Sequence, residues 1–63
     1  MQKPKFKRGE YVYFIGRHSK KIEYVVVDSF YNDKIQEYKY LLRGLKHPFR
    51  RKERIESNIK RLN

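Results

Sequence analysis

The chain has 63 residues, enough for one thin core, which excludes a second domain and leads us to expect a single domain over residues 1–63. Its hydrophobic residues make up 38% and include six tyrosines and four phenylalanines, so the chain can fold although 38% of its residues are charged. The 17 lysines and arginines against seven carboxylates give a net charge of +10, and the lack of cysteine excludes disulfides and thiolate chemistry.

The N-terminal residues 1–5 are basic, and we expect them to form a frayed end. They lack the apolar run of a signal peptide, and no segment approaches the roughly 20 apolar residues of a membrane span. We therefore expect a soluble, cytoplasmic protein without a membrane partner.

The first expected strand is residues 11–15, a run of β-branched and aromatic side chains that ends at Gly16. A polar, basic loop follows at residues 17–20. If Val12 and Phe14 point inward, the alternating residues of this strand form its exposed face.

The second expected strand is residues 22–27, with residues 28–30 as a weaker extension. Its three consecutive valines, residues 25–27, indicate burial on both faces or a bulge that switches faces. Residues 31–34 contain the Asn and Asp of a tight turn, so we expect a hairpin here.

The third expected strand alternates Tyr38, Tyr40 and Leu42 with mostly polar residues, which predicts one inward aromatic face. Gly44 ends this strand. A helix is disfavoured next, because His47 precedes a proline and is pushed toward extended geometry.

The last segment supports two interpretations. Ile55, Ile59 and Leu62 recur at the i, i+4 and i+7 spacing of an amphipathic helix. Alternatively, residues 49–55 form a fourth strand, residues 56–58 a single helical turn, and residues 59–62 a short fifth strand. Periodicity alone favours the helix.

Two segments resemble the SH3-like small barrels of the KOW and Tudor type. Residues 6–14 look like the opening in which a glycine and an acid precede a Val-x-aromatic strand, and residues 54–59 resemble the ending, where a strand runs into a 3₁₀ turn and an aliphatic anchor. The resemblance implies an all-β, five-stranded barrel with a short 3₁₀ turn before the last strand. A three-stranded sheet with a C-terminal helix is the alternative. Such barrels often have a glycine early in the second strand, which this chain lacks.

The expected core of this barrel is formed by seven side chains of the strands and the final anchor. They are Val12, Phe14, Tyr38, Tyr40, Leu42, Ile55 and Ile59.

The residues offer little for catalysis. His18 lies beside Ser19, but adjacent side chains usually point apart, and His47 is typical of a turn. The three glycines are isolated, so no phosphate loop is present, and the histidines lack zinc spacing. We expect no enzyme, no cofactor and no metal site. A cage for methylated peptides is disfavoured, because the net charge of +10 repels basic peptides.

The positive charge lies at both ends of the chain. Residues 1–21 carry +6 and residues 43–63 carry +6, while residues 22–42 carry −2. A barrel that brings the ends together has one electropositive side, which predicts binding of DNA or RNA. The expected phosphate-binding residues are Arg17, Lys20, Lys21, Arg43, Lys46, Arg50, Arg51 and Lys52, near Arg54, and an exposed Tyr13 or Tyr31 could stack on a base. A solvated basic surface is the alternative reading of the same residues.

A protein adaptor is the alternative function. Small barrels accept partners along an exposed strand edge, and Tyr11, Tyr13 and Ile15 would form an aromatic patch on the first strand. The partner would then be acidic.

Overall fold

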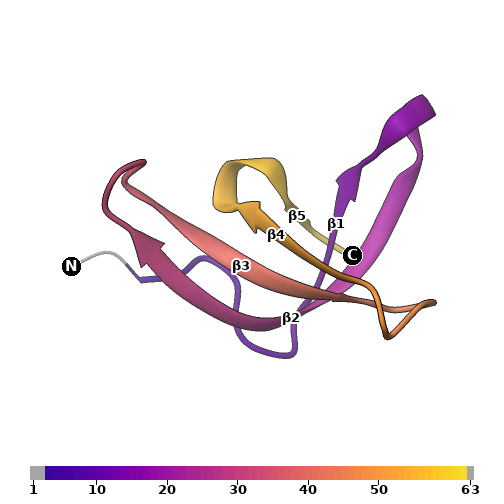
Figure 1. Cartoon of the computed structure of the whole chain (residues 1–63), viewed down its shortest axis with the longest axis horizontal. Coiled ribbons are helices and arrows are strands. Elements are labelled where there is room, and N and C mark those ends of the chain that lie inside the picture. The colour runs from indigo at the N-terminus through magenta and orange to yellow at the C-terminus, as the bar shows by residue number, and fades with distance from the viewer. Residues whose placement is uncertain (1–2, 63) are drawn as a thin grey trace.

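The computed structural model describes residues 3–62 and is all-β, with five antiparallel strands in one sheet of order β4-β3-β2-β1-β5 (Figure 1). Two short 3₁₀ helices, η1 and η2, interrupt the strands. The elements are β1 (Tyr11–Ile15), η1 (Arg17–Ser19), β2 (Lys21–Asn32), β3 (Glu37–Gly44), β4 (Arg51–Ile55), η2 (Glu56–Asn58) and β5 (Lys60–Arg61).

The C-terminal segment settles the choice between helix and strands. Residues 51–61 form β4, η2 and β5, so the alternative with a C-terminal helix is wrong. Within residues 3–62 strand pairing does not join β4 to β5, so the sheet is not closed into a barrel. No helix in this part of the chain is long and apolar enough to cross a membrane.

β1 lies between β2 and β5, and its side chains alternate between buried and more exposed positions, as the sequence predicts. Val12 and Phe14 are buried, whereas Tyr11 and Ile15 are exposed on the other face. The backbone of β1 pairs with residues 21–25 of β2 and with both residues of β5.

β2 is longer than expected and bends across the whole sheet (Figure 1). The predicted bulge is present, because the register with β3 shifts between Val26 and Asp28. A bulge bends a strand and increases its twist, so it supplies the curvature that a glycine supplies elsewhere. The regular strand continues to Asn32, and the turn predicted at residues 31–34 lies at residues 33–36 instead.

The core confirms five of the seven expected side chains. Val12, Phe14, Tyr40, Leu42 and Ile59 are buried. Of the other two, Tyr38 is half-buried and packs against the core, whereas Ile55 is half-buried opposite Lys39, on the face away from Tyr40. Burial of Phe6 and Tyr24 was not predicted, whereas the buried Val25 and Val26 belong to the valine run for which two-sided burial or a bulge was expected.

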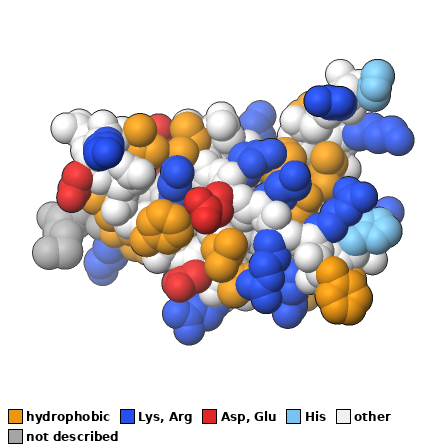
Figure 2. All heavy atoms as spheres, viewed as in Figure 1, with side chains coloured by type: hydrophobic (Ala, Val, Ile, Leu, Met, Phe, Trp, Pro, Cys, Tyr) orange, Lys and Arg blue, Asp and Glu red, His pale blue; other side chains and the backbone are white. Residues whose placement is uncertain are grey.

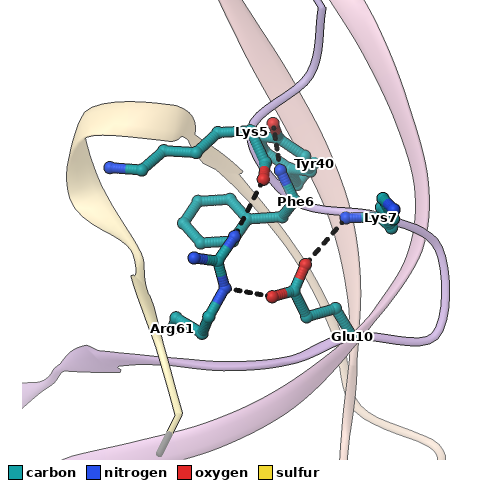
Figure 3. A network of polar contacts seen from close by, with 6 residues as sticks. All are labelled: Lys5, Phe6, Lys7, Glu10, Tyr40 and Arg61. Carbon is teal, nitrogen blue, oxygen red and sulfur yellow. Dashed lines mark hydrogen bonds and ion pairs between the residues drawn. The ribbon is translucent and has the colours of Figure 1, made fainter.

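Phe6 closes one end of the core and is 1% exposed (Figure 3). Its ring meets that of Tyr40 edge to face, with centroids 5.4 Å apart. The Phe6 N–H donates to the Tyr40 hydroxyl at 3.2 Å, and this hydroxyl donates to Glu56 Oε2 at 2.5 Å. The segment before β1 is therefore part of the folded domain.

Arg61 and Glu10 fasten the two ends of the chain together (Figure 3). Arg61 Nε donates to Glu10 Oε2, and Arg61 Nη2 donates to the Lys5 carbonyl at 3.1 Å. The Lys7 N–H and the Arg61 guanidinium hold the pKa of the Glu10 carboxyl below its ordinary value. Of the end expected to fray, residues 1 and 2 lie outside the described residues, whereas Lys5 is hydrogen-bonded through both its N–H and its carbonyl.

Candidate nucleic-acid interface

A groove of about 860 Å³ runs between the β1–η1 segment and the β4–η2 segment. We call it the basic groove. Five cationic side chains line it, namely Arg17, Arg50, Lys52, Arg54 and Lys60. No aspartate or glutamate of residues 3–62 is among its lining residues. The groove therefore has an uncompensated positive charge, which favours an anionic ligand.

The register of β3 and β4 explains which cations face the groove. Lys52 lies opposite Leu42, and Arg54 lies opposite Tyr40. Directly opposite residues of an antiparallel pair point to the same face, so these two cations lie on the face that carries the core. Gly16 ends β1 and leads into η1, which brings Arg17 to the other side of the groove.

Aromatic side chains form the apolar part of the groove. The rings of Phe14 and Tyr24 are stacked, with centroids 5.1 Å apart and planes 12° apart. The Arg54 guanidinium lies 4.6 Å from the centroid of Phe14. This cation–π contact orders the guanidinium over the groove instead of leaving it free in solvent.

A second, smaller groove of about 440 Å³ lies beside the first, between the start of β2 and the β3–β4 loop. Its cations are Lys20, Lys21, Lys46 and Arg50, and Glu23 is its carboxylate. Arg50 lines both grooves. Figure 2 shows Lys and Arg side chains gathered over this end of the molecule, while the visible carboxylates lie over the centre and the opposite end.

Six of the eight predicted phosphate-binding residues thus surround two adjoining grooves. They are Arg17, Lys20, Lys21, Lys46, Arg50 and Lys52. Arg43 and Arg51 line neither groove. They are register partners and lie on the opposite face of the sheet, because their neighbours Leu42 and Lys52 lie on the face that carries the core.

The two predicted stacking residues are separated. Tyr13 lines the basic groove, and Lys21 Nζ lies 4.4 Å from its ring centroid. Tyr31 lies in the hairpin of β2 and β3, where its ring meets that of Tyr38 at 5.2 Å. Tyr31 lines neither groove.

Two features were not predicted from the sequence, one within the basic groove and one in the loop beside the grooves. Lys60 belongs to the short β5, whose pairing with β1 is visible only in the fold. Phe49 was expected within the fourth strand, but β4 begins at Arg51 and Phe49 is 98% exposed in the loop before it. The proline at position 48 was the available signal, because proline is favoured in turns.

Comparison with models of protein families, with curated proteins and with solved structures gives no match.

Proposed function

We propose that the chain is a nucleic-acid-binding module that holds the phosphates of DNA or RNA in the basic groove. The observation that carries the proposal is the groove's lining of five cations with no carboxylate from residues 3–62. Phosphate contacts by lysine and arginine release counterions, which is the main source of affinity in sequence-independent binding. Tyr13 is half-buried and lines the groove, so it offers a ring that a base can contact beside these cations, whereas Phe14 and Tyr24 are buried in the core.

The proposed fold type is an SH3-like small barrel, opened between β4 and β5. Support comes from the position of β1 between β2 and β5 and from the 3₁₀ helix η2 before the last strand. Ile59 follows η2 and is buried, as an aliphatic anchor of this fold type would be. The fold type alone implies binding and names no ligand.

The experiment compares two double charge reversals in titrations with an oligonucleotide at several salt concentrations. R17E/K52E changes two cations of the basic groove. R43E/R51E changes the net charge by the same amount on the opposite face. Wild-type affinity should fall with salt by a log-log slope of about −0.7 per phosphate contact on single strands or −0.9 on duplex. The groove variant should bind more weakly and with a flatter slope, by about one unit per lost contact.

The matched variant decides whether oligonucleotide affinity depends on the groove or on the total charge of the protein. R43E/R51E should retain most of the wild-type affinity and slope, because it leaves the groove intact. Equal losses in both variants would show diffuse attraction by net charge. No binding by the wild type near 150 mM salt, a concentration that screens exposed charges beyond about 8 Å, would refute the proposal.

A protein adaptor is a second candidate, favoured by the exposed face of β1. Tyr11 is 54% and Ile15 is 58% exposed, with the half-buried Tyr13 between them. An acidic partner fits the net charge of +10. The adaptor would gain support if a protein co-purified after nuclease treatment and was lost on Tyr11→Ser, a residue outside both grooves, while oligonucleotides failed to bind.

A further inference from the structure

Phe49 is the most exposed large hydrophobic side chain described in residues 3–62, at 98%. The next most exposed aromatic, Tyr11, is 54% exposed. The whole Phe49 ring is therefore in water, and it contributes no buried apolar area to the core. Folding therefore gives no reason for a phenylalanine at this position.

The loop that carries Phe49 has a defined backbone. Arg50 N–H donates to the His47 carbonyl at 2.9 Å, which closes a turn with Pro48 and Phe49 at its centre. Proline at the first central position presets the backbone for such a turn. Gly44 N–H donates to the Arg50 carbonyl at 3.0 Å, and this bond fixes the base of the loop. Phe49 is thus held at the tip of a closed turn.

The surroundings of Phe49 indicate an anionic partner. Lys46 and Arg50 flank Phe49 in its loop and line the grooves, and residues 45–52 contain no carboxylate. One of them, Arg50, is the residue after Phe49 and lines both grooves. Phe49 itself lines neither groove, so a ligand must continue past Arg50 to the loop tip to contact the exposed ring.

We infer that the basic groove takes single-stranded nucleic acid, with an unpaired base stacked on Phe49. This inference rests on the proposed function and narrows it to a substrate class. A single strand presents phosphates and bare base faces together, which matches cations and an aromatic ring side by side. In a duplex the base faces are covered by their neighbours, so a ring at a loop tip finds no stacking surface without unstacking the helix.

The chain contains no tryptophan, so Phe49→Trp provides a single fluorescent reporter at the site. The ligands are a single strand of mixed sequence, its duplex, and an abasic strand of equal length. We expect the single strand to quench the tryptophan and the abasic strand not to. Phe49→Ala should weaken single-strand binding about tenfold or more, with an unchanged salt slope because no phosphate contact is lost. Phe49→Leu should resemble Phe49→Ala, because it keeps the hydrophobicity and removes the ring.

Each other outcome identifies which claim fails. Wild-type protein that binds none of the three ligands would overturn the proposed function and this inference together. If Phe49→Ala binds the single strand as tightly as the wild type does, or if the wild type prefers the duplex, this inference alone is overturned. A blue shift of the tryptophan with phosphatidylserine vesicles, without quenching by the single strand, would overturn it in favour of an anionic membrane surface.

Discussion

The hydroxyl of Tyr40 is enclosed in the core and satisfied on both sides. It accepts a hydrogen bond from the Phe6 N–H and donates one to Glu56 Oε2. Burial and then the hydrogen bond to Glu56 raise the pKa of Tyr40 to about 12. The same contacts join the N-terminal segment, β3 and η2 at one point. Removal of this hydroxyl should therefore lower the stability of the whole domain.

Tyr40→Phe should lower the free energy of unfolding by about 1–3 kcal/mol at neutral pH, because it leaves the buried Phe6 N–H without its acceptor. Urea unfolding measures this loss, and Tyr31→Phe is the matched control at a side chain that is 43% exposed. The control should change stability by less than about 0.5 kcal/mol. Equal effects of the two substitutions would show that the Tyr40 hydrogen bonds do not stabilise the fold.

The raised pKa of Tyr40 also fixes the sign of a pH effect. The unfolded chain loses the phenolic proton near pH 10, whereas the folded chain keeps it up to about pH 12. Rising pH therefore favours the unfolded state. The wild type should lose stability between pH 10 and 12 more steeply than Tyr40→Phe, and parallel curves would contradict this.

At this scale, alternation alone identified Tyr40 as inward-facing. It could not identify Phe6 as buried, because Phe6 precedes the first strand and has no periodic neighbours. Its burial depends on contacts with Tyr40 and Arg61, which are 34 and 55 residues away in the sequence.

At the scale of the elements, local sequence patterns were sufficient to predict the strands but not the C-terminal segment. The patterns of β1 and β3 were predicted with their inward faces, and the valine run of β2 predicted a bulge or two-sided burial, but no inward face was predicted for β2. The helical spacing of Ile55, Ile59 and Leu62 was misleading. Ile55 ends β4 and Ile59 follows η2, so the repeat spans different elements and describes no single helix.

The loop before β4 depends on Gly44, which permits a close approach of the backbone. A Cβ at Gly44 would lie 2.7 Å from the His47 carbonyl oxygen, so the loop backbone would have to move. Gly44→Ala should destabilise the domain by about 1–3 kcal/mol, the range for overpacking. Gly16→Ala is the comparison, because there the Cβ meets the flexible end of the Ile22 side chain. Urea unfolding should show the larger loss for Gly44→Ala, and the reverse order would contradict this reading of the loop.

At the scale of the whole molecule, the sequence predicted a positive side from the charges at the two ends of the chain. The fold brings six of the eight predicted cations to two adjoining grooves. The remaining two, Arg43 and Arg51, were assigned from proximity in the sequence. Arg43 is turned away by the alternation of β3, in which Leu42 is buried. The position of Arg51 depends on the register of β3 with β4, and a shift of one residue would exchange it with Lys52 on the groove face. Charge counting cannot determine that register.

Amide chemical-shift mapping with a short single-stranded oligonucleotide tests the central claim most directly. The account predicts that perturbed amides cluster in residues 13–17, 49–54 and 57–60, and that the changes weaken as salt is added. The β2–β3 hairpin, residues 30–38, should be unaffected at ligand concentrations that saturate the groove. Perturbations centred on the β2–β3 hairpin, or no perturbation at low salt, would contradict binding of nucleic acid in the basic groove.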